Sequence, residues 1–268
     1  MWALAAADFG AELEVVELPR PEPGPGELAV RLLAASVNPF DRKVVGGMFR
    51  GSAEHRFPLV PGTDGAGVVE GSGERIFGTF FHKPVGVGTY AEYVTVPEGN
   101  ALAPIPDGLD PAVAAALPTA GMTALQLVEA LGDARSVLVV GASGGVGSFT
   151  VQLAEAAGKR VIPIRRGDSL VEADALIDLV STDRSSFEAN ARYAPLAFNT
   201  NYVSADPSQN FGMKGSREDL ERLAAMVLAG ELEVPIARRV PLREAADVFA
   251  GRGPGKTVIV MQVVVLAR

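Results

Sequence analysis

The chain has 268 residues, no cysteine, two histidines and a formal net charge of −8. The lack of cysteine excludes a disulfide scaffold, an iron–sulfur site and a thiolate zinc site, and two histidines are too few for us to predict any metal site. The acidic balance argues against nucleic acid and membrane surfaces as partners, and no stretch has the pattern of a signal peptide or a membrane span, so we expect a cytoplasmic protein.

The first third of the sequence predicts a small β-rich domain. The segment from Pro19 to Gly26 cannot be helical, because proline occupies every other position. Glycine and proline separate five strand-like apolar stretches, at residues 14–18, 28–37, 68–70, 75–81 and 90–96.

From Asp110 onward, helices and strands alternate. Asp110 is a favourable N-cap, and Pro111 is a favourable first helical residue. Helices are predicted at residues 112–117, 119–131, 148–157, 217–229 and 241–250, and strands at 136–140, 161–164, 175–180, 196–198, 233–236 and 256–262. This alternation predicts an α/β fold with a parallel sheet.

A glycine-rich turn gives the strongest local signal. An apolar strand at residues 136–140 leads into Gly141-Ala-Ser-Gly-Gly-Val-Gly147, and a predicted helix follows. In dinucleotide-binding folds such glycines allow a tight turn, close approach to the pyrophosphate and close helix–strand packing. We therefore predict cofactor contacts from Ser143, Gly144, Gly145, Val146 and Gly147. An ordinary glycine-rich turn is the alternative.

The end of the next strand bears on the choice between NAD and NADP. Arg165 and Arg166 follow Ile164 there, and no acidic residue stands at the strand end to bind ribose hydroxyls. Two guanidinium groups suit a 2′-phosphate, so we predict NADPH as the cofactor. Solvated arginines are the alternative, and Asp168, just beyond the strand, weakens the prediction.

Six segments, spread over nearly the whole chain, carry a more specific signal. They are Ala35–Asp41 (ASVNPFD), Phe57–Val69 (FPLVPGTDGAGVV), Gly88–Val94 (GTYAEYV), Ala114–Leu125 (AAALPTAGMTAL), the glycine-rich turn, and Gly255–Val260 (GKTVIV). In this order they resemble the medium-chain dehydrogenase/reductase superfamily, in its zinc-independent quinone oxidoreductase and enoyl reductase branch.

The resemblance implies a fold and an activity. Residues 1–118 would form a GroES-like β-rich catalytic domain, residues 119–231 a shortened Rossmann domain with a doubly wound parallel sheet, and residues 232–268 a return to the first domain. The protein would transfer a hydride from NADPH to a quinone or an α,β-unsaturated carbonyl, without zinc, and it would form a homodimer. A non-catalytic protein that binds NADPH or another ligand and keeps the fold is the alternative.

The resemblance also implies roles for individual residues. Asn38 would lie near the nicotinamide and substrate, with Asp41 beside it on the same loop, whereas backbone capping and a structural hydrogen bond are their alternative roles. Asp64 is expected as a turn or cap residue, and Lys256 either approaches the cofactor or is a solvated charge. Further cofactor contacts would come from Thr123, Val180, Phe198 and Asn199.

The sequence departs from the family in two respects. Phe49 stands where relatives often have a tyrosine that can supply a proton, which weakens an enoyl-thioester substrate and is neutral for a quinone. The chain is also short near residues 70, 167–172 and 194, and six residues at 167–172 are too few for a crossover between parallel strands. Either the nucleotide-binding domain is reduced, or mobile segments are left out of the sequence; we favour the second explanation.

Overall fold

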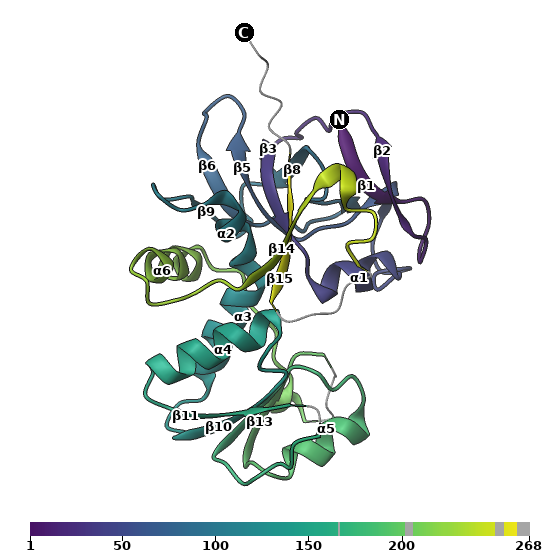
Figure 1. Cartoon of the computed structure of the whole chain (residues 1–268). Helices are drawn as coiled ribbons and strands as arrows, with labels where there is room; N and C mark the ends of the chain where they lie inside the picture. Colours follow the sequence, from purple (N-terminus) through teal and green to yellow (C-terminus); the bar gives the residue numbers. More distant parts are fainter. Residues whose placement is uncertain (166, 202–205, 250–254, 262–268) are drawn as a thin grey trace. The chain divides into compact units, whose positions relative to one another are not determined.

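The computed structural model describes residues 1–165, 167–201, 206–249 and 255–261. The chain divides into two compact units, drawn in Figure 1: unit 1 comprises residues 1–119 and 215–268, and unit 2 comprises residues 120–214. In the part of the chain that the structure describes, no helix combines the length and the apolar character needed to cross a membrane.

Unit 1 contains a seven-stranded sheet in the order β14–β15–β3–β5–β6–β9, with β8 also paired to β3. The strand β3 is central because it pairs along different parts of its length with β15, β5 and β8. The bounds are β3 (Glu27–Ser36), β5 (Asp64–Val69), β6 (Arg75–Thr79), β8 (Tyr93–Pro97), β9 (Leu102–Pro104), β14 (Ile236–Pro241) and β15 (Lys256–Val260).

A second sheet of unit 1 has the order β2–β1–β4–β7. Its strands are β1 (Trp2–Ala6), β2 (Leu13–Glu17), β4 (His55–Val60) and β7 (Val85–Val87). Side chains of both sheets, including Leu4, Leu32, Leu59 and Phe80, share one buried core. The predicted β-rich domain is therefore confirmed, although sequence patterning missed β1, β4, β7 and β9.

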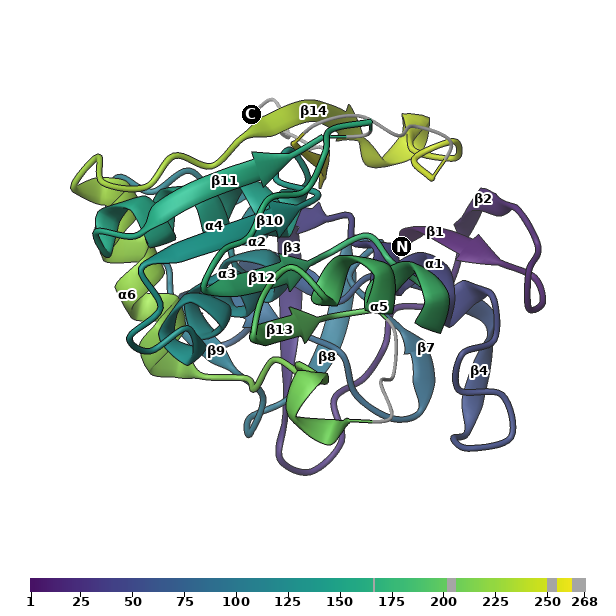
Figure 2. The ribbon, with the colours of Figure 1, turned by 90° about the horizontal axis from the view of Figure 1, so that it is seen from below.

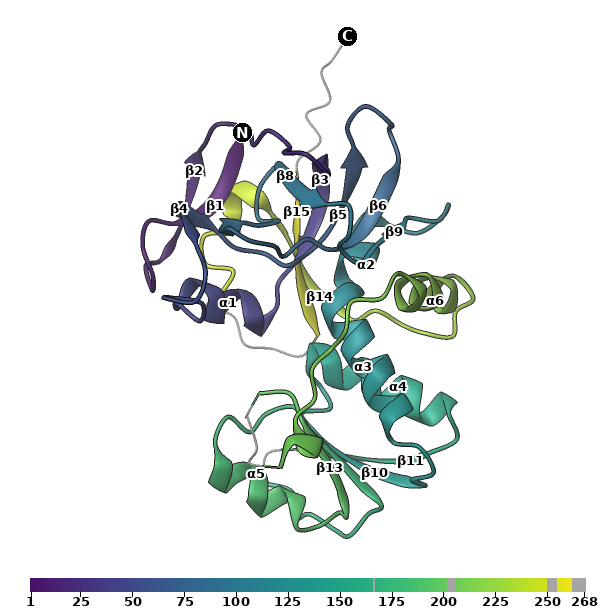
Figure 3. The ribbon, with the colours of Figure 1, turned by 180° about the vertical axis from the view of Figure 1, so that it is seen from behind.

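Among its described residues, unit 1 also has three helices and a 3₁₀ turn: α1 (Pro39–Val45), α2 (Pro111–Ala116), α6 (Arg217–Leu228) and η2 (Leu242–Glu244). The Asp110 carboxylate accepts a hydrogen bond from the Ala112 amide at 2.8 Å, so the predicted N-cap is confirmed. Helix α6 packs beside β9 (Figure 3). Because of this packing, the chain returns to unit 1 at Gly215, earlier than the expected boundary at residue 232.

Two predictions near the C-terminus were wrong. The expected helix at 241–250 is only the 3₁₀ turn η2 within its described residues, and the expected strand at 233–236 is replaced by β14, which begins at Ile236. Strand β14 runs parallel to β15 and buries Val240. This pairing takes Pro241 into a strand, and the residues that follow form η2 and turns, with Leu242, Ala245 and Val248 buried in the core.

Unit 2 is a parallel sheet in the order β11–β10–β12–β13, which confirms the predicted α/β fold. Its strands are β10 (Ser136–Val140), β11 (Arg160–Ile164), β12 (Ala175–Asp178) and β13 (Leu196–Asn199). Figure 2 shows α4 (Gly145–Ala156) and α5 (Arg184–Ala191) on opposite faces of this sheet. A longer helix, α3 (Pro118–Ala130), and the 3₁₀ turn η1 (Pro207–Gln209) complete the elements of this part of the chain.

The connections from β5 to β6 and from β11 to β12 are short, and the residues present are enough to join the strands. The turn from β5 to β6 is tight, with the Gly73 amide donating to the Val69 carbonyl at 2.9 Å. Strands β11 and β12 lie on either side of β10, and residues 165–174 join them with no helix or strand among the described residues. Ten extended residues reach about 33 Å, whereas the return along a five-residue strand and across two strand spacings needs about 20 Å.

The structure corrects one expectation. The expectation that this stretch is too short for a crossover was wrong, because an extended loop can cross where a helix cannot. Unit 2 has a single strand, β11, on one side of β10. That segments are left out of the sequence near residues 70, 167–172 and 194 stays a prediction.

Candidate functional site

Six polar side chains meet in the interior of unit 1. We call Asn38, Asp41, Thr63, Asp64, Tyr90 and Lys256 the buried polar cluster, since each is at most 7% exposed. Burial of three ionisable carboxyl and ammonium groups is costly unless they are paired and hydrogen-bonded. The hydrogen bonds within the cluster therefore decide whether these buried charges are stabilised.

Asp41 anchors one half of the cluster. Its Oδ2 accepts hydrogen bonds from the backbone amide of Asn38 and from the Tyr90 hydroxyl, both at 2.8 Å. Its Oδ1 accepts from the Thr63 hydroxyl at 2.9 Å. Asp41 lies in the first turn of α1, and Asn38 is the N-cap of that helix. The expected loop is thus a helix start, where Asp41 holds the backbone of Asn38 in place.

Asn38, Asp64 and Lys256 form the other half. Asn38 Nδ2 donates to Asp64 Oδ2, and Lys256 Nζ donates to Asn38 Oδ1, both at 2.8 Å. Asp64 also accepts from the Thr119 amide at 3.1 Å and from its hydroxyl at 2.6 Å. Lys256 is therefore not a solvated charge. Asp64 is the buried start of β5 and not a turn residue, but the expected capping role is confirmed, because it accepts from the Thr119 backbone amide in the first turn of α3.

The strand register explains why these residues meet. Within the large sheet, Ser36 at the end of β3 lies opposite Asp64 of β5 on one side and opposite Val258 of β15 on the other. Asn38 follows β3 by two residues, so it lies between the first residues of the two neighbouring strands. A glycine at residue 62 permits the close approach of Tyr90, because a Cβ there would lie 2.5 Å from the Tyr90 ring.

Burial shifts the ionisation of the cluster. Desolvation raises the pKa of Asp41 to about 6, and its hydrogen bonds from Asn38 and Tyr90 only partly oppose this. Desolvation likewise raises the pKa of Asp64 and lowers the pKa of Lys256, while the attraction between these two groups opposes both shifts. The pKa of Tyr90 is raised well above 10 by burial and by the nearby Asp41, so its hydroxyl keeps its proton.

In unit 2, the glycine-rich turn joins β10 to α4. Gly141 has a φ of +88°, which favours glycine, and Gly144 is the N-cap of α4 with no side-chain cap. A Cβ on Gly147 would lie 2.1 Å from the Gly141 carbonyl oxygen, so helix and turn pack too closely for any side chain. The first amides of a helix have no intrahelical acceptor and carry the positive end of its dipole, so this turn fits an anionic phosphate group.

The other predicted cofactor contacts of unit 2 lie mainly where the parallel strands end. Arg165 follows β11 and is exposed, Val180 follows β12 and is 58% exposed, and Phe198 and Asn199 end β13 and are buried. Because the strands are parallel, these ends share one edge of the sheet with the glycine-rich turn. Thr123 lies on α3 and is buried, and Arg166 lies outside the described residues.

Asp178, which sequence analysis did not select, organises this edge. It ends β12, is buried, and accepts hydrogen bonds from the amides of Val180 and Ser181, both at 2.9 Å. It also accepts from the Ser181 hydroxyl at 2.7 Å and from Asn190 at 2.9 Å. The loop that carries the exposed Val180 is thereby fixed beside Gly141, whose added Cβ would meet Val180 at 2.7 Å.

Sequence reasoning also missed the roles of Tyr90, Thr119 and Lys256 in unit 1. Their partners are far away along the chain, 218 residues in the case of Lys256 and Asn38. The one available signal was Asp64 within the glycine-rich run from Gly62 to Gly67, where a carboxylate among small residues indicates burial.

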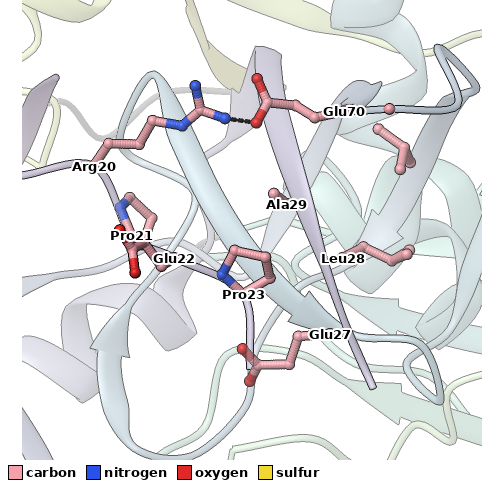
Figure 4. Close-up of a pocket in the computed structure, with 10 residues that line it drawn as sticks. Arg20, Pro21, Glu22, Pro23, Glu27, Leu28, Ala29 and Glu70 are labelled. Carbon is pink, nitrogen blue, oxygen red and sulfur yellow. Dashed lines mark ion pairs between the residues drawn. The ribbon is translucent and has the colours of Figure 1, made fainter. Parts of the chain in front are cut away.

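A surface depression of about 580 Å³ lies elsewhere on unit 1 and contains no predicted site residue (Figure 4). Arg20 pairs with Glu70 across it and stacks on Tyr93, 4.1 Å from the ring centroid. The one cation in its lining is thus engaged by neighbours. Among the described residues, no group of three or more His, Asp or Glu side chains is arranged to hold a metal ion.

Comparisons with known proteins agree with this geometry. Residues 24–107 match the family model of the alcohol dehydrogenase GroES-like domain. A chloroplast envelope quinone oxidoreductase homolog of Arabidopsis thaliana is 38% identical over 181 residues, covering 60% of this chain and 54% of that protein. A 2-methylene-furan-3-one reductase of Solanum lycopersicum is 36% identical over 174 residues, covering 58% and 44%.

The solved quinone oxidoreductase of Coxiella burnetii superimposes with a TM-score of 0.81 at 25% identity, covering 98% of this chain and 99% of that one. The sequence matches span only about half the length of the curated relatives. With a GroES-like domain, a parallel sheet with its glycine-rich turn, and these relatives, the chain resembles the medium-chain dehydrogenase/reductase superfamily, in its quinone oxidoreductase-like branch.

Proposed function

We propose that the protein is an NADPH-dependent oxidoreductase that reduces a quinone or an α,β-unsaturated carbonyl without zinc. The observation that carries the proposal is the glycine-rich turn between β10 and α4, which leaves the first amides of α4 uncapped and too little space for a side chain at Gly147. The names of the quinone oxidoreductase and 2-methylene-furan-3-one reductase relatives support both acceptor classes.

The residues of the chain divide the task of binding. The turn from Ser143 to Gly147 would hold the pyrophosphate, and Arg165 together with Arg166 would hold the 2′-phosphate through charge-assisted hydrogen bonds. Val180, Thr123, Phe198 and Asn199 would contact the remainder of the cofactor. When bound, the reduced nicotinamide supplies a hydride to the acceptor, which gains a proton from water while NADPH becomes NADP⁺.

In unit 1, Asn38 would contact the ligand, and Asp41 would act on Asn38. The carboxylate of Asp41 is fully engaged by the Asn38 amide, Tyr90 and Thr63, so it positions the start of α1. The Tyr90 hydroxyl stays protonated and donates a hydrogen bond to Asp41. A proton from solvent therefore suits the reduction of a quinone better than a proton from Tyr90.

The activity is tested by measuring NADPH oxidation with a panel of quinones and enones, and the loss of NADPH absorbance is the readout. Turnover on at least one acceptor is expected. The reduced sheet, with β11 alone on one side of β10, favours a second candidate function, a non-catalytic NADPH-binding protein. Cofactor binding with no turnover on any acceptor would establish this second candidate instead.

The preference for NADPH is tested at Arg165 and Arg166. Replacing both by alanine should weaken NADPH binding by ~2–4 kcal/mol in total, while NADH binding changes little. Arg160→Ala is the matched control, because Arg160 begins the same strand at the opposite end. Unchanged NADPH affinity in the double variant would remove the case for the 2′-phosphate.

We also propose a homodimer formed through an edge strand of the nucleotide-binding unit. Both β11 and β13 are edge strands of the four-stranded sheet, and exposed edges are available for pairing with a second copy. Light scattering coupled to gel filtration should give a mass near twice 27.9 kDa. A mass equal to that of one chain would exclude the dimer under those conditions.

A further inference from the structure

The carboxamide of Asn38 is held at both ends by charged groups. Its Nδ2 donates to Asp64, and its Oδ1 accepts from Lys256, each at 2.8 Å. An ammonium group has only donors and a carboxylate has only acceptors, so these partners determine which end of the amide is oxygen and which is nitrogen. A flip of the amide would break two charge-assisted hydrogen bonds at once.

The carboxamide of Asn38 has a hydrogen-bond acceptor left over and no donor. The Nδ2 atom has two N–H bonds: the first is directed to Asp64, and the second is within 3.5 Å of the Ser36 carbonyl oxygen. The Oδ1 atom has two lone pairs, of which Lys256 takes one. The amide therefore retains an acceptor, while its donors are directed into the protein.

We infer that Lys256 and Asp64 are positioning residues that make Asn38 a hydrogen-bond acceptor toward its ligand. The group that Asn38 recognises is accordingly a neutral donor, either an amide N–H or a hydroxyl group, and not the carbonyl oxygen of an acceptor substrate. This inference rests on the proposed function, in which Asn38 contacts the cofactor or the substrate.

The arrangement is built into the sheet. Asp64 and Lys256 are the first residues of β5 and β15, the two strands that flank the end of β3. The backbone is fixed here as well, because the Val37 amide donates to the Thr257 carbonyl at 2.9 Å and the Asp41 carboxylate accepts from the backbone amide of Asn38. Both charged partners are buried and start from fixed positions in the sheet, so the orientation of Asn38 is a property of the folded domain.

A nicotinamide nucleotide offers both kinds of donor, in its carboxamide and in its ribose hydroxyls. The experiment therefore compares the affinity of NADP⁺ with that of two analogues by calorimetry. One analogue is 3-acetylpyridine adenine dinucleotide phosphate, in which a methyl group replaces the amide nitrogen. The other lacks the 2′-hydroxyl group of the nicotinamide ribose.

The wild-type protein should bind one of these analogues about fivefold more weakly than NADP⁺, as expected for one hydrogen bond. In Asn38→Ala this difference should disappear, while Lys256 and Asp64 keep their electrostatic attraction. Lys256→Met should also remove the difference, and Lys256→Arg should restore it because it keeps the donor. The matched control is Ser36→Ala, which removes a buried hydroxyl beside Asn38 that has no hydrogen-bond partner in the described structure.

The analogue that is bound more weakly identifies the donor as the amide or the hydroxyl. The inference is overturned if Asn38→Ala discriminates among the three cofactors as the wild type does, or if its only defect is a higher KM for the carbonyl substrate. Failure of the wild type to bind NADP⁺ and NADPH at all would instead defeat the proposed function. Circular dichroism establishes that each variant is folded, and Asn38→Ala decides the matter if Lys256→Met does not fold.

Discussion

The two units of the chain prepare for a ligand in different ways. Unit 1 encloses Asp41, Asp64 and Lys256 and satisfies them with hydrogen bonds from neighbouring side chains and amides. Unit 2 offers backbone amides at the start of α4, where close packing at Gly147 excludes any side chain. Buried charges give a fixed orientation at a high cost in desolvation, whereas exposed amides bind an anion with little cost to the fold.

This contrast predicts the largest effect at Lys256. Lys256→Met leaves the Asp64 carboxylate buried without its cation and should lower the free energy of unfolding by about 3–5 kcal/mol. The control is Arg239→Met on the neighbouring strand β14, which breaks the half-exposed pair with Asp110. That change should cost less than about 1 kcal/mol. Urea unfolding measures both, and equal losses would show that burial does not distinguish the two cations.

Asp41 should make the stability of unit 1 depend on pH. Its pKa is about 6 in the folded protein and 3.8 in an unfolded chain, so the folded state binds the proton more tightly. Its contribution to the free energy of unfolding is present below pH 3.8 and is lost as the pH rises through about 6, by roughly 3 kcal/mol.

The variant Asp41→Asn supplies the reference for this prediction. An amide at this position can still accept from the Asn38 amide and donate to Thr63, so the variant should fold. The difference in unfolding free energy between wild type and variant should fall between pH 4 and pH 7. A difference that is independent of pH would contradict the buried, ionisable state of Asp41.

The glycine-rich turn of unit 2 should respond to a change in shape, because it carries no charged side chain. Gly147→Ala places a methyl group against the Gly141 carbonyl and should cost about 1–3 kcal/mol of stability. It should also weaken NADPH binding by at least about tenfold, since the uncapped amides of α4 move with the turn. Gly212→Ala is the control, because a Cβ there meets nothing within 4 Å. Unchanged NADPH affinity in Gly147→Ala would place the cofactor elsewhere.

The same contrast explains what the sequence could predict. The glycine-rich turn is local: strand, turn and helix follow one another within about 20 residues, so its pattern is legible before the fold is known. The six family segments extended the prediction to the fold class of the whole chain. They did not show that Lys256 reaches Asn38 or that Tyr90 reaches Asp41, because such contacts depend on strand register in the sheet.

The errors have the same physical origin. The stretch from Pro241 has local helical preference, but pairing with β15 extends β14 to Pro241. The crossover from β11 to β12 looked too short because helices are the common way to make one, and an extended loop covers the distance with fewer residues. In both places a tertiary arrangement decides between conformations that are close in local free energy.

The central claim, hydride transfer from NADPH to an unsaturated acceptor, is tested most directly by isotope transfer. The protein is incubated with NADPH that carries deuterium at both positions of C4 of the nicotinamide, together with an enone that the protein reduces. Mass spectrometry should find one deuterium on the β-carbon of the saturated ketone. Bound cofactor with no product, or a product without deuterium, would contradict the account.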